Sequence, residues 1–338
     1  ELSELTGIQK SILNDVIRGK RSLTPEMALL LENALGISAT YLMNIQTQYE
    51  LDCAKLSEKV MLQTKMLEIW NVLKVQVSIP FFRKVNIVKG NIVEDVKRIF
   101  EVFAVDNLDD FFGLKAEEME LSYYRKSDKA KTDPVDILSW KYYCYHLSKS
   151  VESPSCPFDK GADVQALTIE LNSVFKENKD TVNRTKMVLE KYGIKFLVVN
   201  KVGQVPVDGM SFWNGDTPTI VITERIATID NFAFTTLHEV GHVFRHLSPN
   251  GKAMINLMED KKSIEESEAD DFALNAILPS ADWKKFMSKT RNVIPYKIAP
   301  YIKMEADNHN VNPQLLFGRY KHDIGIYKIK NFFETKVL

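Results

Sequence analysis

The sequence predicts an α+β chain that is mostly helical, with its strands confined to one short region. Apolar residues recur at helical spacing over most of the chain. Two segments break this rhythm: the apolar run KYGIKFLVVN reads as a buried strand, and GMSFWNGDTPTIVIT reads as two strands joined at Asn214-Gly215-Asp216, a strong hairpin signal. A length of 338 residues predicts two or three domains.

The composition excludes some classes of protein. The net charge is −1, so any contact with nucleic acid must come from a local basic patch. No apolar run approaches the roughly 20 residues of a membrane helix. The three cysteines, Cys53, Cys144 and Cys156, form no CxxC pair and no disulfide framework, which fits a reducing cytoplasm. We therefore expect a cytoplasmic protein without a membrane span.

The first fifty residues carry a helix-turn-helix pattern. In ELSELTGIQKSILNDVIRGK the apolar residues keep a helical rhythm that Gly7 breaks, so a short helix, a turn and a second helix follow one another. Gly19 ends the second helix. Thr24-Pro25-Glu26 supplies a cap, a first-turn proline and a first-turn acid for the next helix, which stops at Gly36.

The runs RGKRSLTPEMAL and ALGIS resemble the Xre/Cro family of repressors, especially the HigA-type antitoxins. Those proteins have one more helix before the motif, so we expect the domain's first helix to be missing from this chain. The resemblance implies that the second helix enters the major groove of operator DNA, with base edges facing Gln9, Lys10, Ser11 and Asn14. By the same resemblance, the phosphate contacts come from Arg18, Lys20 and Arg21.

The region from 51 to 160 is expected to be a helical connector. The basic stretch YYRKSDKAK within it is read as a solvated connector, with contact to DNA or a partner as the alternative. Its end, VESPSCPFDKGAD, contains two prolines and several charges and is the best candidate for a linker.

The segment TTLHEVGHVFRHL, residues 235–247, contains HExxH from His238 to His242. On a helix, residues i and i+4 lie on one face about 6 Å apart, so both imidazoles are able to reach one zinc ion at ~2.1 Å. Glu239 lies one step round the helix, where it meets a metal-bound water without being a ligand. His246 lies about 12 Å along the axis from His238 and is expected to stay off the same ion.

A catalytic zinc site needs a third protein ligand and one open position. A metzincin would place a histidine six residues after His242, but that residue is Ser248. The remaining solution is a carboxylate on a second helix, which the segment KKSIEESEADDFALNAILPS supplies. Glu265 and Glu268 share one face of that helix, and the small Ala269 beside them permits two helices to approach.

TLHEVGHVFRH followed by ESEADDFALNAILP resembles the ImmA/IrrE family of zinc metallopeptidases, in which a helix, a strand and a hairpin precede HExxH. The resemblance covers about residues 165–285 and implies a zincin-like domain with a small antiparallel sheet and one Zn²⁺ per chain. The implied ligands are His238, His242 and Glu268, with Glu265 as the alternative to Glu268. It also implies that Asp271 orients a ligand imidazole.

The implied activity is that of a gluzincin-like zinc metallo-endopeptidase. Zinc lowers the pKa of its bound water from 15.7 toward about 7, and Glu239 takes the proton and later delivers it to the leaving amine. The strand at 218–223 is expected to pair with an extended substrate. The candidates for stabilising the oxyanion are Tyr320, His322 and Arg225.

A helix-turn-helix before this peptidase is a recurrent arrangement in phage-related regulators, which supports both resemblances. Two functions remain open. In the first, the protein is a DNA-binding transcriptional regulator that cleaves a repressor or antitoxin-like protein, another chain or itself. In the second, it is a HigA-like antitoxin and repressor whose zincin domain senses a metal or ligand and cuts nothing. Glu239 favours the first, since a sensor needs no general base there. The expected partners are operator DNA, a protein substrate and a second copy in a homodimer.

Four domains are expected from these patterns. They are the helix-turn-helix domain at 1–50, the helical connector at 51–160, the zincin-like domain at 161–285 and a helical C-terminal extension at 286–338.

Overall fold

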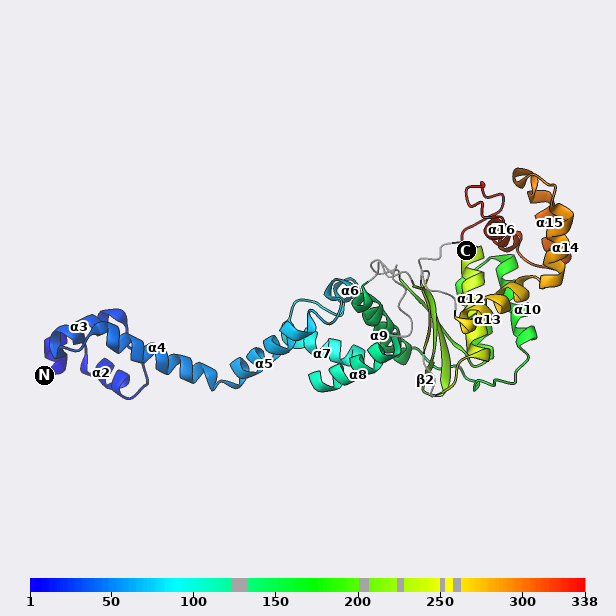
Figure 1. Ribbon diagram of the computed structural model, residues 1–338. Coiled ribbons are helices and arrows are strands. Elements are labelled where there is room, and N and C mark those ends of the chain that lie inside the picture. The colour runs from blue at the N-terminus through cyan, green and yellow to red at the C-terminus, as the bar shows by residue number, and fades with distance from the viewer. Residues whose placement is uncertain (123–132, 201–206, 224–227, 250–252, 258–262, 338) are drawn as a thin grey trace. The chain divides into compact units, whose positions relative to one another are not determined.

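The computed structural model describes residues 1–122, 133–200, 207–223, 228–249, 253–257 and 263–337 (Figure 1). The chain divides into two compact units, of which the first holds Glu1–Leu73 with Gly90–Val96 and the second holds Lys74–Lys89 with Lys97–Leu338. The basic stretch YYRKSDKAK and Arg225 lie outside the described residues. Among the described helices, none combines the length and the apolar content needed to cross a bilayer.

The described elements are mostly helices, as the sequence predicts. The helices of the N-terminal half are α1 (Leu2–Thr6), α2 (Lys10–Ile17), α3 (Pro25–Leu35), α4 (Ala39–Lys55), α5 (Glu58–Leu73), α6 (Ile79–Lys84), α7 (Ile92–Phe103), α8 (Leu108–Ser122) and α9 (Pro134–Ser150). The later helices are α10 (Val164–Glu177), α11 (Thr181–Lys191), α12 (Ile229–Arg245), α13 (Ile264–Ile277), α14 (Ser280–Thr290), η2 (Pro295–Lys297), α15 (Ala299–Asn308) and α16 (Pro313–Asp323). The strands are β1 (Lys195–Val199), β2 (Val207–Asn214), β3 (Thr217–Thr223) and β4 (Met254–Leu257).

The first unit begins with a helix-turn-helix, as the helical rhythm broken at Gly7 predicts. Gly7 ends α1 with φ 70°, a left-handed conformation that costs a glycine little. Thr24 caps α3 by accepting a hydrogen bond from the Met27 amide. A small core forms beneath these helices, made of Ile8, Leu13, Leu23, Met27, Ala28 and Ala39. Helix α4 then continues without a break past residue 50, where the first domain was expected to end.

Aromatic side chains hold helices α6 to α9 together. Phe103 stacks on Tyr142 with ring centroids 4.8 Å apart, and its edge meets Phe111 at 5.1 Å. Phe81 in α6 contacts Tyr143 in α9 at 5.5 Å. The part of the connector from α6 onward is therefore packed and not an extended tether.

The four strands form one sheet in the order β1-β3-β2-β4. The hairpin is confirmed: β2 and β3 pair antiparallel around Gly215, whose φ is 61°. The sheet is mixed, however, because β1 runs parallel to β3, and this corrects the expectation of an antiparallel sheet. The hairpin reverses the chain, so β3 regains the direction of β1 and lies between β1 and β2.

Helices cover both faces of this sheet (Figure 1). On one face lies α9, where Tyr145 packs edge-on against Phe212 of β2 and Ser148 accepts a hydrogen bond from Asn214. On the other face lies α12, whose Phe232 contacts Phe196 of β1. Helix α12 is consequently buried between the sheet and the remaining helices.

The C-terminal helices share the core of the sheet domain. Leu315, Leu316 and Phe317 of α16 belong to the same buried cluster as Leu237 and Val240 of α12. The expected linker also joins this core, since Phe158 packs against Trp213 and Phe244. The sheet, α12 and the C-terminal helices therefore share one continuous core.

Candidate functional site

Helix α12 carries HExxH and is buried along almost its whole length. Leu237 and Val240 face the core and are fully buried. His238, Glu239 and His242 are also buried, with at most 1% of each exposed. Two imidazoles and a carboxyl group are costly to bury without partners, so the surroundings of these side chains decide what the site does.

Helix α13 crosses α12 at its glycine. A β-carbon on Gly241 would lie 3.3 Å from Cα of Ala269 and 3.1 Å from Cδ1 of Phe272, closer than ordinary packing allows. The two small residues therefore permit the close approach, as the sequence predicts for Ala269. Ser263 caps the start of α13 by accepting a hydrogen bond from the Glu266 amide. This fixes the first turn of α13 beside the two histidines.

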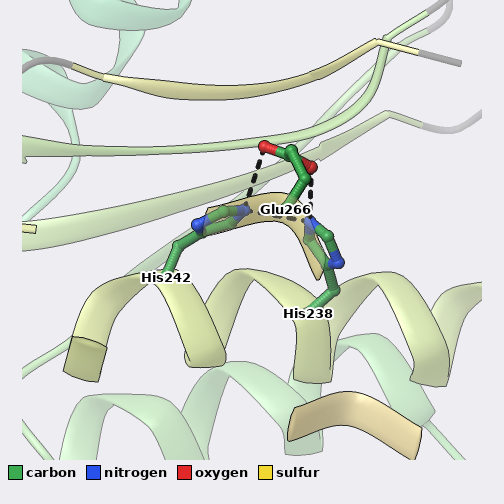
Figure 2. Close-up of side chains that lie close together, drawn as sticks. All are labelled: His238, His242 and Glu266. Atoms are coloured by element: carbon green, nitrogen blue, oxygen red, sulfur yellow. Dashed lines mark hydrogen bonds and ion pairs between the residues drawn. The ribbon is translucent and has the colours of Figure 1, made fainter. Parts of the chain in front are cut away.

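Three donor atoms converge between the helices (Figure 2). Nε2 of His238 lies 3.0 Å from Nε2 of His242. Oε2 of Glu266 lies 3.2 Å from His238 Nε2, and Oε1 of Glu266 lies 3.3 Å from His242 Nε2. One nitrogen or oxygen from each of the three side chains lies within 4.8 Å of the others. Two imidazoles and a carboxylate form a donor set that suits zinc, with bond lengths of roughly 2.0–2.2 Å.

The structure brings Glu266 to the histidines and not Glu268 or Glu265, which corrects the expectation for the third ligand. Glu268 instead points to His246, with Oε2 2.9 Å from Nε2, and Glu265 is exposed. The reason is the rotation of α13 about its axis: Ala269, Ala273 and Ile277 are buried. Extending their stripe by one turn toward the helix start places Glu266 on the inner face.

Asp270 holds the second nitrogen of His238, in the role expected for Asp271. Its Oδ1 lies 3.0 Å from His238 Nδ1. Asp271 is exposed and lies on the outer side of α13, where its backbone oxygen accepts a hydrogen bond from Asn275. The sequence contained a signal for this arrangement, because Glu266 and Asp270 are spaced by four residues like His238 and His242.

His246 does not join the three convergent atoms, as the distance along the helix predicts, but it contacts His242. Its Nδ1 lies 3.0 Å from Nδ1 of His242. It is the residue that ends α12, and only 8% of its side chain is exposed. The sequence reading of a plain helix-end residue therefore missed this contact.

Glu239 points toward strand β2. A β-carbon on Gly209 would lie 2.5 Å from Glu239 Oε1 and 2.9 Å from Thr235 Cγ2, so a larger residue would force the carboxylate or Thr235 to move. Neither oxygen of Glu239 makes a hydrogen bond of ordinary geometry with the described residues, although Ser211 lies near enough to influence its pKa. Gly209 and Ser211 are site residues that the sequence analysis missed, since nothing in a strand pattern reports what lies opposite it.

Burial and pairing shift the pKa values of these groups strongly. Burial raises the pKa of Glu239 to about 8, against an opposing effect of His238. Burial alone would lower the pKa of His238, but hydrogen bonds to Asp270 and Glu266 outweigh it and raise the value to about 10. Burial likewise opposes ionisation of Glu266, and its contacts with His238 and His242 outweigh that and lower its pKa to about 2. These shifts favour a protonated His238 beside an ionised Glu266 whenever no metal is bound.

Two further expectations about catalysis change with the structure. The strand at 218–223 lies within β3, which is paired on both sides by β1 and β2, so it has no free edge for a substrate. Of the candidate oxyanion stabilisers, Tyr320 is buried within the core cluster, and His322 is exposed beside Asp323. Within the described part of the chain, neither residue makes a hydrogen bond or ion pair with His238, His242 or Glu266.

The expected DNA-contacting residues all lie at the surface of the first unit. Gln9 precedes α2, three of them lie on α2, and Arg18 ends it. Lys20 and Arg21 follow, and both backbone amides donate to the carbonyl of Asp15. All seven side chains are exposed, as a contact surface requires: Gln9, Lys10, Ser11, Asn14, Arg18, Lys20 and Arg21.

Two family models match the chain. Residues 1–42 match a helix-turn-helix family. Residues 189–307 match the peptidase family described as the IrrE N-terminal-like domain, and this range contains β1 to β4, α12 and α13. No curated protein and no solved structure matches the chain. The first model covers the exposed face of α2, and the second covers the convergent histidines and Glu266.

Proposed function

We propose that the protein is a transcriptional regulator with zinc-dependent endopeptidase activity. The proposal rests on the match of residues 1–42 to a helix-turn-helix family and of residues 189–307 to the IrrE-like peptidase family. Its proposed substrate is a repressor or antitoxin-like protein, either another protein or this chain itself. The observation that carries the proposal is the convergence of His238, His242 and Glu266 with the buried Glu239 beside them.

The three side chains fit a zinc ion by their chemistry. Two imidazole nitrogens and a carboxylate oxygen leave a fourth position open, as catalytic zinc sites do. An ion held there acts as a Lewis acid on a carbonyl oxygen and makes water more acidic. Asp270 fixes the ring of His238, so that its Nε2 remains directed at the site.

Glu239 is the proposed general base. Its carboxylate makes no hydrogen bond of ordinary geometry with the described residues and is therefore available to take a proton from the attacking water. Burial raises its pKa to about 8, nearer to neutral pH than that of an exposed glutamate. The same residue then delivers the proton to the leaving amine. Gly209 opposite keeps the space that the carboxylate needs.

We propose that an extended substrate binds along the free edge of strand β4. Within the described residues, β1 and β4 are the outer strands of the sheet, and β4 pairs with β2. Gly209 of β2 touches Glu239, so the edge beyond β4 lies on the side of the sheet nearer the candidate base. A peptide added there would form backbone hydrogen bonds with β4. Such bonds do not depend on the side chains of the peptide.

The proposed DNA contact uses α2 and the residues that follow it. Asn14 and its neighbours on α2 would read base edges in the major groove, and Arg18 and Lys20 would meet phosphates. Two copies of the chain would bind two half-sites of an operator, as the geometry of helix-turn-helix dimers requires.

One observation favours the alternative of a sensor that cuts nothing. Glu239 is fully buried and His238 is 1% exposed, so a metal or ligand would be held in an enclosed site. In a sensor, the bound metal would alter the protein's hold on DNA without hydrolysis.

The two functions separate in one experiment. Wild type, Glu239→Gln and His238→Ala are compared for zinc content and for cleavage of co-expressed neighbouring regulators. A peptidase keeps its zinc but loses cleavage in Glu239→Gln. If wild type and Glu239→Gln both bind one zinc and neither cleaves any regulator, the peptidase proposal fails and the sensor stands. If wild type binds no metal and His238→Ala changes nothing, both fail.

A further inference from the structure

The two ligand histidines receive different support from the same helix. His238 Nδ1 meets the carboxylate of Asp270 directly, at 3.0 Å. Among the residues that the structure describes, His242 Nδ1 makes no contact with a carboxylate; it meets Nδ1 of His246 at 3.0 Å. His246 in turn places its Nε2 2.9 Å from Oε2 of Glu268. A carboxylate of α13 thus stands behind each ligand, once directly and once through a third histidine.

We propose that His246 and Glu268 form a relay that positions His242 as a metal ligand. The inference rests on the proposed metal site. His246 and Glu268 are positioning residues here, because neither touches the metal-binding atoms. The relay gives Glu268 a role other than the third ligand that the sequence predicts. It also gives His246 a role beyond that of a helix-end residue.

Only one assignment of hydrogen-bond donors and acceptors along the relay allows His242 to bind a metal through Nε2. A histidine that binds a metal through Nε2 must carry its proton on Nδ1. His242 therefore donates from Nδ1, and the Nδ1 of His246 that faces it must accept. A neutral His246 then carries its proton on Nε2 and donates it to the Glu268 carboxylate. Each contact has one donor and one acceptor, and the tautomer of His242 is fixed by the chain of contacts.

The helices hold the relay in place. His246 ends α12, where its amide donates to the His242 carbonyl, and its side chain is only 8% exposed. Arg245 donates from Nη1 to the backbone carbonyl of Glu268 at 3.2 Å and lies over the Phe272 ring at 5.2 Å. These contacts tie the end of α12 to the start of α13, at the level of the relay.

Zinc affinity measures the relay without any need for a substrate. Competition against a chromophoric chelator is applied to the wild-type chain and its variants. We expect His246→Leu to weaken zinc binding about ten- to hundredfold, and Glu268→Ala about tenfold. His246→Asn is expected to lie within about threefold of wild type, because its side-chain oxygen still accepts from His242 Nδ1.

A matched control is His309→Leu, which should leave zinc affinity unchanged. His309 likewise ends a helix, α15, and lies 3.4 Å from a glutamate, Glu305. If His246→Leu unfolds the chain, Glu268→Ala decides, because that side chain is 51% exposed and its loss leaves the core intact. Wild-type affinity in Glu268→Ala and in a folded His246→Leu overturns the relay and leaves the metal site standing. A wild-type chain that binds no zinc overturns the relay and the proposed function together.

Discussion

Gly241 of α12 and Ala269 of α13 meet so closely that a β-carbon on the glycine would lie 3.3 Å from Cα of the alanine. This contact sets how near the two helices run. Glu266 precedes Ala269 by almost one helical turn, and His238 and His242 lie on either side of Gly241. The distance between the two helices therefore controls whether carboxylate and imidazoles converge.

Enlarging Gly241 should separate the helices. In an open helix, Gly→Ala stabilises by up to about 1 kcal/mol, but here Gly241→Ala should give no gain, and Gly241→Val should cost about 1–3 kcal/mol through overpacking. Urea unfolding of the metal-free chain measures both. Gly113→Ala in α8 is the control, because nothing lies within 4 Å of its β-carbon. Equal gains at both positions would contradict the close contact.

Removing Glu266 should abolish the metal site. We expect Glu266→Ala to weaken zinc binding by at least about a hundredfold, since loss of even a supporting group typically costs about 10–100-fold. Glu265→Ala, one residue earlier and exposed, should bind zinc as the wild type does. Metal analysis after dialysis and chelator competition measure both variants. If Glu265→Ala lost zinc while Glu266→Ala still bound it, Glu265 and not Glu266 would be the third ligand.

A side chain at position 209 should act through Glu239. Gly209→Ala places a β-carbon 2.5 Å from Glu239 Oε1 and 2.9 Å from Thr235 Cγ2, and we expect it to cost about 1–3 kcal/mol of stability. In the Glu239→Ala background part of that cost should disappear, because Oε1 of Glu239 is gone while Cγ2 of Thr235 remains 2.9 Å away. A double-mutant cycle by chemical denaturation tests this coupling. Strict additivity of the two changes would show that the glycine does not serve the carboxylate.

Zinc affinity should rise with pH. In the metal-free site the pKa of His238 is about 10, so at neutral pH a proton must leave before the nitrogen can bind a metal. Glu266, with a pKa of about 2, is ionised throughout and adds no dependence. Between pH 6.5 and 8.5 we expect about a tenfold gain in affinity per pH unit for each proton displaced. Titration calorimetry in two buffers of different ionisation enthalpy counts those protons, and a flat profile would contradict the pairing.

The exposed face of α2 should carry the DNA contacts. Asn14→Ala is expected to weaken binding to DNA from upstream of the gene by roughly 1–3 kcal/mol and to relax its sequence preference. Lys20→Ala should weaken binding to all sequences alike and reduce the salt slope by about 1. Lys59→Ala, on an exposed position of α5, is the control. Fluorescence anisotropy at several salt concentrations measures all three, and unchanged binding in Asn14→Ala and Lys20→Ala would remove the DNA contact from α2.

Local sequence determined much of this protein. The spacing of four residues and the period of the α-helix place His238 and His242 on one side of α12. Gly215 marks the hairpin because its turn needs a positive φ, and Gly7 and Thr24 mark helix ends through conformational freedom and capping. Each of these signals acts within a few residues of the element it defines, so no knowledge of the rest of the chain was needed.

Tertiary structure alone decided which residue completes the site. The segment IEESEADD offers acidic side chains all round α13, and spacing cannot tell which of them faces α12. Packing decides it: Ala269 meets Gly241, and Ala273 and Ile277 enter the core. That rotation directs Glu266 and Asp270 to His238 and leaves Glu268 for His246. The parallel pairing of β1 with β3, and the closeness of Gly209 to Glu239, follow from the same kind of contact between segments distant in the chain.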